Sequence, residues 1–300
     1  MVLVKIADAQ NRPENLELLV AQRRLYSDAK RWRGVRTAGS LLVGIPLPIL
    51  AVVVPASQSL VSAVGAAWLV VTVSLMFGLE RGKVASATRV LEQFDVAVFS
   101  LPWNGRVAGA RVSPEVIARA AKANTEPVDR LRDWYPCVAD ELPYPISVLM
   151  CQRATVVWDW RLRRSYAVLV FLLVVLLAAI ATTIALTLKF TLAEFLLILV
   201  LPMASAFASG IVTALTHFGD VHDQREMEQR FNDDWERVLV EPQSMTVTEC
   251  RQHQDCRFHL RMRSLPIPDF WYRRSRGSYE ADMQAAADRM VGEFVRAVGV

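Results

Sequence analysis

Charge is absent from three long stretches of this sequence. No Lys, Arg, Asp, Glu or His occurs in the 43 residues between Arg36 and Glu80, and further uncharged runs cover 166–188 and 195–216. About 20 apolar residues cross the roughly 30 Å hydrocarbon core of a bilayer, so the first run suffices for two spans and each other run for one. These runs predict an all-α membrane protein with four transmembrane helices in two hairpins, at about 38–56, 60–79, 167–188 and 193–215.

Signatures of secretion and catalysis are lacking as well. The N-terminal segment is polar and includes Asp8 and Glu14, whereas a signal peptide has its apolar core within the first ~20–25 residues. We therefore expect the first span itself to direct insertion. The sequence contains no Gly-x-Ser-x-Gly, P-loop, Gly-x-Gly-x-x-Gly or His-Glu-x-x-His motif. We predict no catalytic residue, no cofactor and no enzymatic activity.

Cysteine is scarce, with four residues in 300. Two of them belong to Cys250-x-x-His253-x-x-Cys256-x-x-His259, which has the residue types of a zinc site. Steps of three residues rotate by about 300° on a helix, so these four side chains spread around half of it and only neighbours could share an ion. We therefore expect an ordinary helix and no metal. All four cysteines fall on the side predicted below to be cytoplasmic, where no disulfide is expected.

Lys and Arg are distributed very unevenly along the chain. Only Lys189 of the 34 lies in the turn of a membrane hairpin. Because basic residues near spans stay in the cytoplasm, both termini and the central segment are predicted to be cytoplasmic in a bacterial inner membrane. The net charge of +4 then requires no DNA or RNA partner, and the lipid bilayer is the expected contact. The predicted parts are a cytoplasmic N-terminal helix, a hairpin, a cytoplasmic segment, a second hairpin and a cytoplasmic helical tail, at 1–36, 37–80, 81–165, 166–216 and 217–300.

Helices are expected outside the spans too. Span two should continue to about Leu101-Pro102, and a helix from 13 should lead into span one. Further helices are expected at about 114–124, from 146 into span three, from span four to about 238, at 247–263 and at 278–298. Together these segments predict a small, mainly helical cytoplasmic domain built from three separated pieces of chain.

Span four carries a polar stripe on one of its faces. Its members are Glu194, Ser205, Ser209, Thr213 and Thr216. Such a stripe can line water, or it can form a helix contact, because small and hydroxyl residues let membrane helices approach closely and hydrogen-bond; both interpretations stay open. No charge lies at mid-membrane, which disfavours a transporter. Prolines predict kinked or broken helices in spans one and four, at Pro46, Pro48, Pro55 and Pro202.

Short motifs spread over nearly the whole chain resemble one family. They include Glu92-Gln93-Phe94-Asp95, Asp133-Trp134-Tyr135-Pro136, Cys151-Gln152-Arg153, and Gln254-Asp255 followed by Arg261. Their set and order are similar to those of the SMODS-associated four-transmembrane effector family. Its members are effectors of bacterial anti-phage defence, with a proposed pore-forming activity. They accompany nucleotidyltransferases that make cyclic oligonucleotides, in systems of the CBASS type.

The resemblance implies a membrane effector that binds a cyclic oligonucleotide, forms a homo-oligomer and permeabilises the inner membrane, with growth arrest or cell death as the result. A polyanionic ligand needs Arg donors and aromatic side chains that stack on bases. The candidates are Arg153, Arg163, Arg164, Trp134, Tyr135, Arg273 and Arg274. Retention on the cytoplasmic side also explains the arginines beside the spans. The alternative function is a membrane receptor or scaffold that recruits a partner without permeabilising the bilayer.

Overall fold

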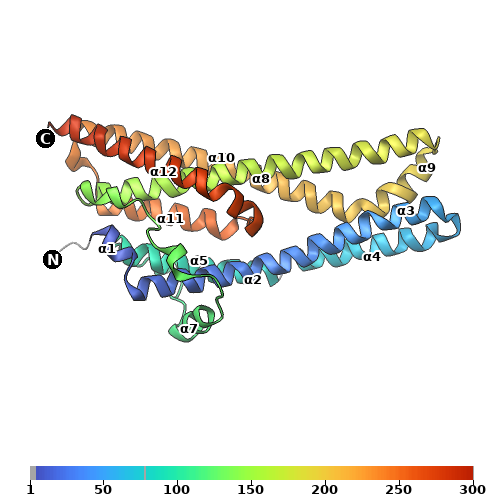
Figure 1. Cartoon of the computed structure of the whole chain (residues 1–300), viewed down its shortest axis with the longest axis horizontal. Coiled ribbons are helices and arrows are strands. Elements are labelled where there is room, and N and C mark those ends of the chain that lie inside the picture. Colours follow the sequence, from blue (N-terminus) through green and yellow to red (C-terminus); the bar gives the residue numbers. More distant parts are fainter. Residues whose placement is uncertain (1–4, 78, 300) are drawn as a thin grey trace. The chain divides into compact units, whose positions relative to one another are not determined.

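The protein is built from helices (Figure 1). The computed structural model describes residues 5–77 and 79–299, in which no β-strand occurs, and 85% of the chain is helical, which confirms the all-α class. The long helices are α2 (Pro13–Gly44), α4 (Gln58–Phe77), α5 (Leu79–Val98), α8 (Ile146–Thr187), α10 (Leu201–Val240), α11 (Val247–Arg263) and α12 (Asp269–Val298). The short elements are α1 (Ile6–Gln10), α3 (Pro46–Val53), η1 (Pro55–Ser57), α6 (Gly105–Ala108), α7 (Pro114–Lys122), η2 (Val128–Leu131), η3 (Cys137–Glu141), α9 (Leu192–Glu194), the π-helical η4 (Phe195–Val200) and η5 (Pro242–Ser244).

The chain divides into two compact units. The membrane unit comprises Ala29–Gly82 and Arg164–Phe218. The head unit is built from three separated segments, Met1–Asp28, Lys83–Arg163 and Gly219–Val300. The division falls within α2, α5, α8 and α10.

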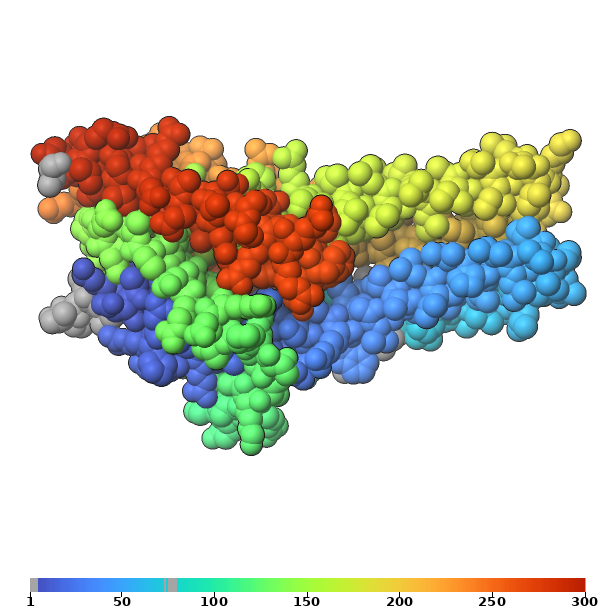
Figure 2. All heavy atoms as spheres, in the orientation of Figure 1, coloured from blue at the N-terminus to red at the C-terminus, as the bar shows by residue number. Residues whose placement is uncertain are grey.

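Four helical stretches are long and apolar enough to cross a membrane, as predicted. They lie within Pro13–Val53, Pro55–Thr72, Ile146–Thr187 and Leu192–Val240. Between 11% and 33% of the most apolar window of each stretch is buried, so most of these side chains lie on the outside of the membrane unit. Figure 2 shows this surface for the span of α8, where Phe171 and Leu172 are more than half exposed. Apolar side chains that face outward suit a lipid environment.

The first hairpin contains a helix break at Pro46, one of the prolines predicted to interrupt span one. Helix α2 ends at Gly44 and α3 begins at Pro46, because a proline has no N–H to continue the helical hydrogen bonds. Helices α2 and α4 lie side by side (Figure 1), and Ser40 accepts a hydrogen bond of 3.2 Å from the Trp68 indole. A Cβ on Gly44 would lie 3.1 Å from the Cβ of Ala206, so α2 also meets α10 closely.

Span four is irregular just before Pro202, but the helix continues through the proline and is not broken. Residues Phe195–Val200 are π-helical, a form in which each N–H bonds the carbonyl five residues earlier. Pro202 cannot donate to the carbonyl of Leu197, and the hydroxyl of Ser62 on α4 donates to that oxygen at 2.8 Å instead. Gly65 on α4 allows the close approach of this irregular segment, because a Cβ at Gly65 would lie 2.6 Å from the Cα of Pro202.

The head unit has an aromatic centre. Tyr135 is fully buried, and its ring stacks on that of Phe94 with the ring centroids 6.1 Å apart. The centroid of the Phe99 ring lies 4.7 Å from that of Tyr135. Phe94 belongs to α5, which continues past span two to Val98 as expected. The chain therefore brings the 133–136 motif against the helix that leads out of the second span.

Most expected helix limits agree with the structure within two residues, but the last helix was predicted too short. It begins at Asp269 and not at 278, with Pro268 immediately before it and the acidic Asp269 in its first turn. Gly277 immediately precedes the predicted start at 278. It lies inside α12 with no heavy atom within 4 Å of the position that a Cβ would take, so it is an exposed helical glycine.

Candidate functional site

Helix α5 places two carboxylates inside the head unit. Glu92 and Asp95 are three residues apart, so they share one face of the helix, and both are buried. Asp95 accepts hydrogen bonds from the Tyr135 hydroxyl at 2.5 Å and from Arg261 at 2.6 Å. Burial by itself would raise the pKa of Asp95, but the guanidinium groups of Arg261 and Arg257 lower it below the ordinary value. Asp95 is therefore an ionised group at neutral pH.

Helix α11 supplies most of the partners of these carboxylates. Their spacing of three or four residues puts them on one helix face: Arg251, Gln254, Arg257 and Arg261. Gln254 donates to Glu92 at 2.7 Å and to Asp95 at 2.8 Å. Arg251 donates to Glu92 at 2.6 Å. Burial, together with the negative charge of Asp95, raises the pKa of Glu92.

The network also reaches helix α8. Arg257 donates to the Thr155 hydroxyl at 2.6 Å, and Gln152 donates to Gln254 at 3.1 Å. The motifs that suggested a family thus meet in one buried network, which ties α5, α8 and α11 together. Its charged groups face one another and not the surface. Most polar atoms of this network have partners, although Gln152 Oε1 and Arg251 Nε have none among the described residues. A buried network of this kind specifies a fold, and it leaves few groups for a ligand.

Two of the predicted ligand-binding arginines also have protein partners. Arg153 donates to the Asn232 side chain at 2.7 Å. Arg163 donates to Asp159 at 2.8 Å and to Asp220 at 3.2 Å. The hydrogen bond of Arg153 and the ion pairs of Arg163 occupy guanidinium groups that a phosphate would otherwise use.

The other five predicted ligand-binding residues differ in accessibility. Tyr135 is buried, and its hydroxyl donates a hydrogen bond to Asp95. Trp134 is half-buried and packs against the apolar core of the head unit. Arg164, Arg273 and Arg274 are exposed. Arg164 belongs to the membrane unit, whereas Arg273 and Arg274 lie on α12 of the head unit.

The polar stripe of span four lies mostly inside the membrane unit. Its buried members are Ser205, Ser209 and Thr213. Thr216 is half-buried. Glu194 is exposed, and with Thr191 it forms a capping box at the start of α9, where its carboxylate accepts the Thr191 N–H at 2.7 Å. Glu194 therefore has a local role that the stripe pattern did not predict.

A compact ion cluster lies at one end of this stripe. Arg33 donates to Glu80 at 3.2 Å and to the Thr213 hydroxyl at 3.0 Å, and Arg36 donates to the other oxygen of Glu80 at 2.7 Å. All three charged residues are only 4% exposed. The cluster joins α2, α5 and α10 at the point where the uncharged runs begin and end. The sequence analysis used these arginines only as topology signals. Their convergence on Glu80 becomes visible only when the helices are packed.

The Cys/His motif on α11 does not bring its four side chains together. Cys250 is buried, and this burial raises the pKa of its thiol to about 12. His253 contacts Asp234 at 2.6 Å, whereas Cys256 and His259 are exposed. The helical rotation predicted from the spacing accounts for this divergence.

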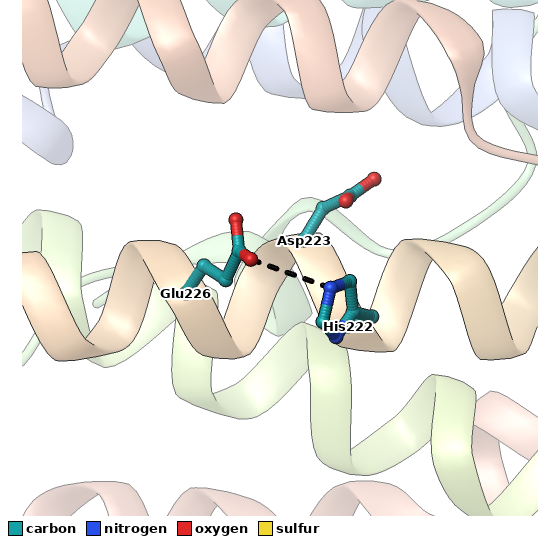
Figure 3. Close-up of side chains that lie close together, drawn as sticks. All are labelled: His222, Asp223 and Glu226. Carbon is teal, nitrogen blue, oxygen red and sulfur yellow. Dashed lines mark ion pairs between the residues drawn. The ribbon is translucent and has the colours of Figure 1, made fainter.

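Among the described residues, one group of three side chains is close enough to share a metal ion. It consists of His222, Asp223 and Glu226 on α10, and Figure 3 shows the 3.3 Å contact between His222 and Glu226. Asp223 forms an ion pair with Arg263 as well. His222 and Glu226 are well exposed, so the contact is a surface pair one helical turn apart.

Comparison with known proteins gives consistent results. A probable CBASS effector molecule of Bacillus cereus (strain VD146) is 25% identical over 281 residues, which cover 88% of this chain and 91% of the relative. No solved structure matches the chain. The family described as the SMODS-associating 4TM effector domain matches residues 4–290. The chain, with its four membrane-length helices, therefore belongs to the SMODS-associating 4TM effector family.

Proposed function

We propose that this chain is the membrane effector of a bacterial CBASS-type anti-phage system and permeabilises the inner membrane when a cyclic oligonucleotide binds. The effector role follows from the family and from the relative described as a CBASS effector. One observation carries the permeabilising activity: the interior of the membrane unit contains buried polar side chains along α10 and at the Arg33–Glu80 cluster. Ionisable and polar groups inside a membrane protein are costly, and they commonly mark ion pathways.

The proposed mechanism is not enzymatic. Binding to the head unit would change the packing of the helices α2, α5, α8 and α10, which supply residues to both units. Several copies would assemble, since the outward face of α8 is apolar and can pack against another copy as well as against lipid. Loss of the membrane barrier would then stop growth or kill the cell.

The ligand is proposed to contact exposed basic groups of the head unit. Arg273 and Arg274 are accessible there, and the half-buried Trp134 offers an aromatic ring. Arg153 and Arg163 would first have to exchange their carboxylate and amide partners for a phosphate.

The proposed orientation places both termini and the head unit in the cytoplasm. It rests on the near absence of basic residues from the turns of the two membrane hairpins. Reporter fusions after Ser57 and Phe190 should give periplasmic signals, and a fusion after Ala123 should give a cytoplasmic one. A cytoplasmic signal from the Ser57 fusion would contradict the orientation.

Dye release tests the activity directly. The purified full chain is placed in liposomes loaded with a self-quenching dye, and synthetic cyclic di- and trinucleotides are added one at a time. We expect release with one cyclic nucleotide and none with its linear counterpart or with empty liposomes. A nucleotide that binds the protein without causing release would support the receptor or scaffold function instead.

A further inference from the structure

Polar side chains run through the interior of the membrane unit. They come from α2, α4, α5 and α10 and are all less than a tenth exposed: Arg33, Arg36, Ser40, Thr72, Glu80, Ser205, Ser209, Thr213 and His217. Hydroxyl side chains are common at contacts between membrane helices, but ionisable groups inside a membrane protein are costly and commonly mark ion pathways. The side chains therefore indicate a path that water and ions can enter when the bundle loosens.

The hydroxyl groups of α10 form a row along this path. Ser205, Ser209 and Thr213 follow one another at intervals of four residues and share one helix face. Thr213 accepts its hydrogen bond from Arg33. The hydroxyl of Ser205 is buried and has no hydrogen-bond partner among the described residues. A buried hydroxyl without a partner is costly, and entry of water would satisfy it.

The charge at the Thr213 end of the row is positive. Arg33 and Arg36 carry two positive charges and Glu80 one negative charge, which leaves a net +1 in the buried cluster. The Nε of Arg36 is buried and makes no hydrogen bond to any described group. Lys189 lies in the turn between spans three and four, and Glu194 lies on the short helix α9 that follows it.

The other end of the bundle is closed by apolar side chains. This apolar seal consists of buried Ala51, Val61, Ala181, Ala185, Ile198, Leu199 and Met203. It includes two residues of the π-helical segment, a form of helix that is frequent at functional sites. A hydrophobic constriction blocks ions because water leaves it, so an apolar cluster of this kind would keep a path through the bundle closed.

We propose that the open path conducts small inorganic anions such as chloride, and that Arg33 and Arg36 select for them. The inference rests on the proposed permeabilising function and adds the class of ion that passes. When the hydroxyl row becomes hydrated, an ion at its Thr213 end would meet two buried guanidinium groups with a single carboxylate. A net positive pore entrance concentrates anions and repels cations, which is how basic side chains give anion selectivity.

The test is the ion selectivity of the full chain in planar bilayers. Currents are recorded across a tenfold KCl gradient, with the synthetic cyclic di- and trinucleotides as activators. A second arm uses Leu199→Ser, which puts a hydroxyl into the apolar seal and should open the path without a ligand. We expect a reversal potential on the chloride side in both arms.

Charge variants then identify the residues that select the ion. Arg33→Gln should lower the chloride-to-potassium permeability ratio at least severalfold, and Glu80→Gln, which raises the buried net charge to +2, should increase it. Arg31→Gln is the matched control, because Arg31 is exposed and lies outside the cluster. The two opposite expectations keep the test informative even where one variant fails to accumulate in the membrane.

The outcomes separate this inference from the proposed function. A conducting protein with a potassium-side reversal potential, or one whose selectivity is unchanged in both cluster variants, overturns the anion path but leaves permeabilisation intact. Absence of any current in both arms, from protein shown to be in the bilayer, overturns permeabilisation and the anion path together.

Discussion

Replacing Asp95 by Asn removes one negative charge from the interior of the head unit with almost no change in volume. Arg257 and Arg261 then lose the carboxylate that they share, whereas Arg251 keeps Glu92 and Asp255, so the net charge of the network becomes more positive by one. Removing one partner of a buried ion pair costs about 3–5 kcal/mol, because the remaining charge stays buried without compensation. Arg261, whose guanidinium donates to Asp95 at 2.6 Å, is the partner most affected. We therefore expect Asp95→Asn to lower the free energy of unfolding by about this amount.

Two further variants calibrate this expectation. Tyr135→Phe removes one hydrogen bond to the same carboxylate, and such a bond to a charged group is worth about 1.5–3 kcal/mol. Asp129→Asn is the matched control, because the Asp129 side chain is 88% exposed and forms only a surface pair with Arg132. A surface ion pair contributes about 0–1 kcal/mol.

The assay is equilibrium unfolding of the full chain in detergent micelles, followed by tryptophan fluorescence during urea titration. The expected order of destabilisation is Asp95→Asn, then Tyr135→Phe, then Asp129→Asn. A stability of Asp95→Asn equal to that of Asp129→Asn would refute the assignment of Asp95 as the ionised centre of the network.

Three other predictions concern the stripe, the irregular segment of span four and the pH dependence. Ser209→Leu should abolish growth arrest upon activation. Loss of leakage with intact cross-linked oligomers would indicate a water-lined face, and loss of both leakage and oligomers would indicate a helix contact. Full killing at normal expression would show that the stripe has no function. Ser62→Ala leaves the Leu197 carbonyl without its donor and should cost about 1–3 kcal/mol of stability. Ser74→Ala is its control, because that hydroxyl bonds within its own helix; equal thermal unfolding of the two variants would contradict the capping role of Ser62. The folded-state pKa of Asp95 is lowered, so its stabilisation is present above about pH 4 and is lost as the pH falls through the lowered pKa. The unfolding free energies of wild type and Asp95→Asn should therefore converge on acidification, and a difference that stays constant down to about pH 2 would contradict this sign.

The helical architecture could be predicted because its causes are local. An uncharged run of given length crosses a bilayer whatever its neighbours are, and a proline removes its own N–H wherever the helix lies. The spans, the break at Pro46 and the irregular segment before Pro202 follow from these two facts. The last helix was predicted to begin at 278 but begins at Asp269, and the exposed Gly277 inside it does not interrupt it.

The partners of the polar groups depended on packing between distant segments. Arg33 and Thr213 are 180 residues apart in the chain, and Ser62 and Leu197 are 135 apart. The sequence by itself determined where the arginines, hydroxyls and carboxylates occur, and it indicated which membrane side holds them. Only the tertiary structure decided that Tyr135 and Arg163 have internal carboxylate partners, and that two arginines share Glu80 inside the membrane unit. The physical reason is that a buried charge takes whichever opposite charge the fold brings within hydrogen-bond distance, and sequence spacing does not encode that distance.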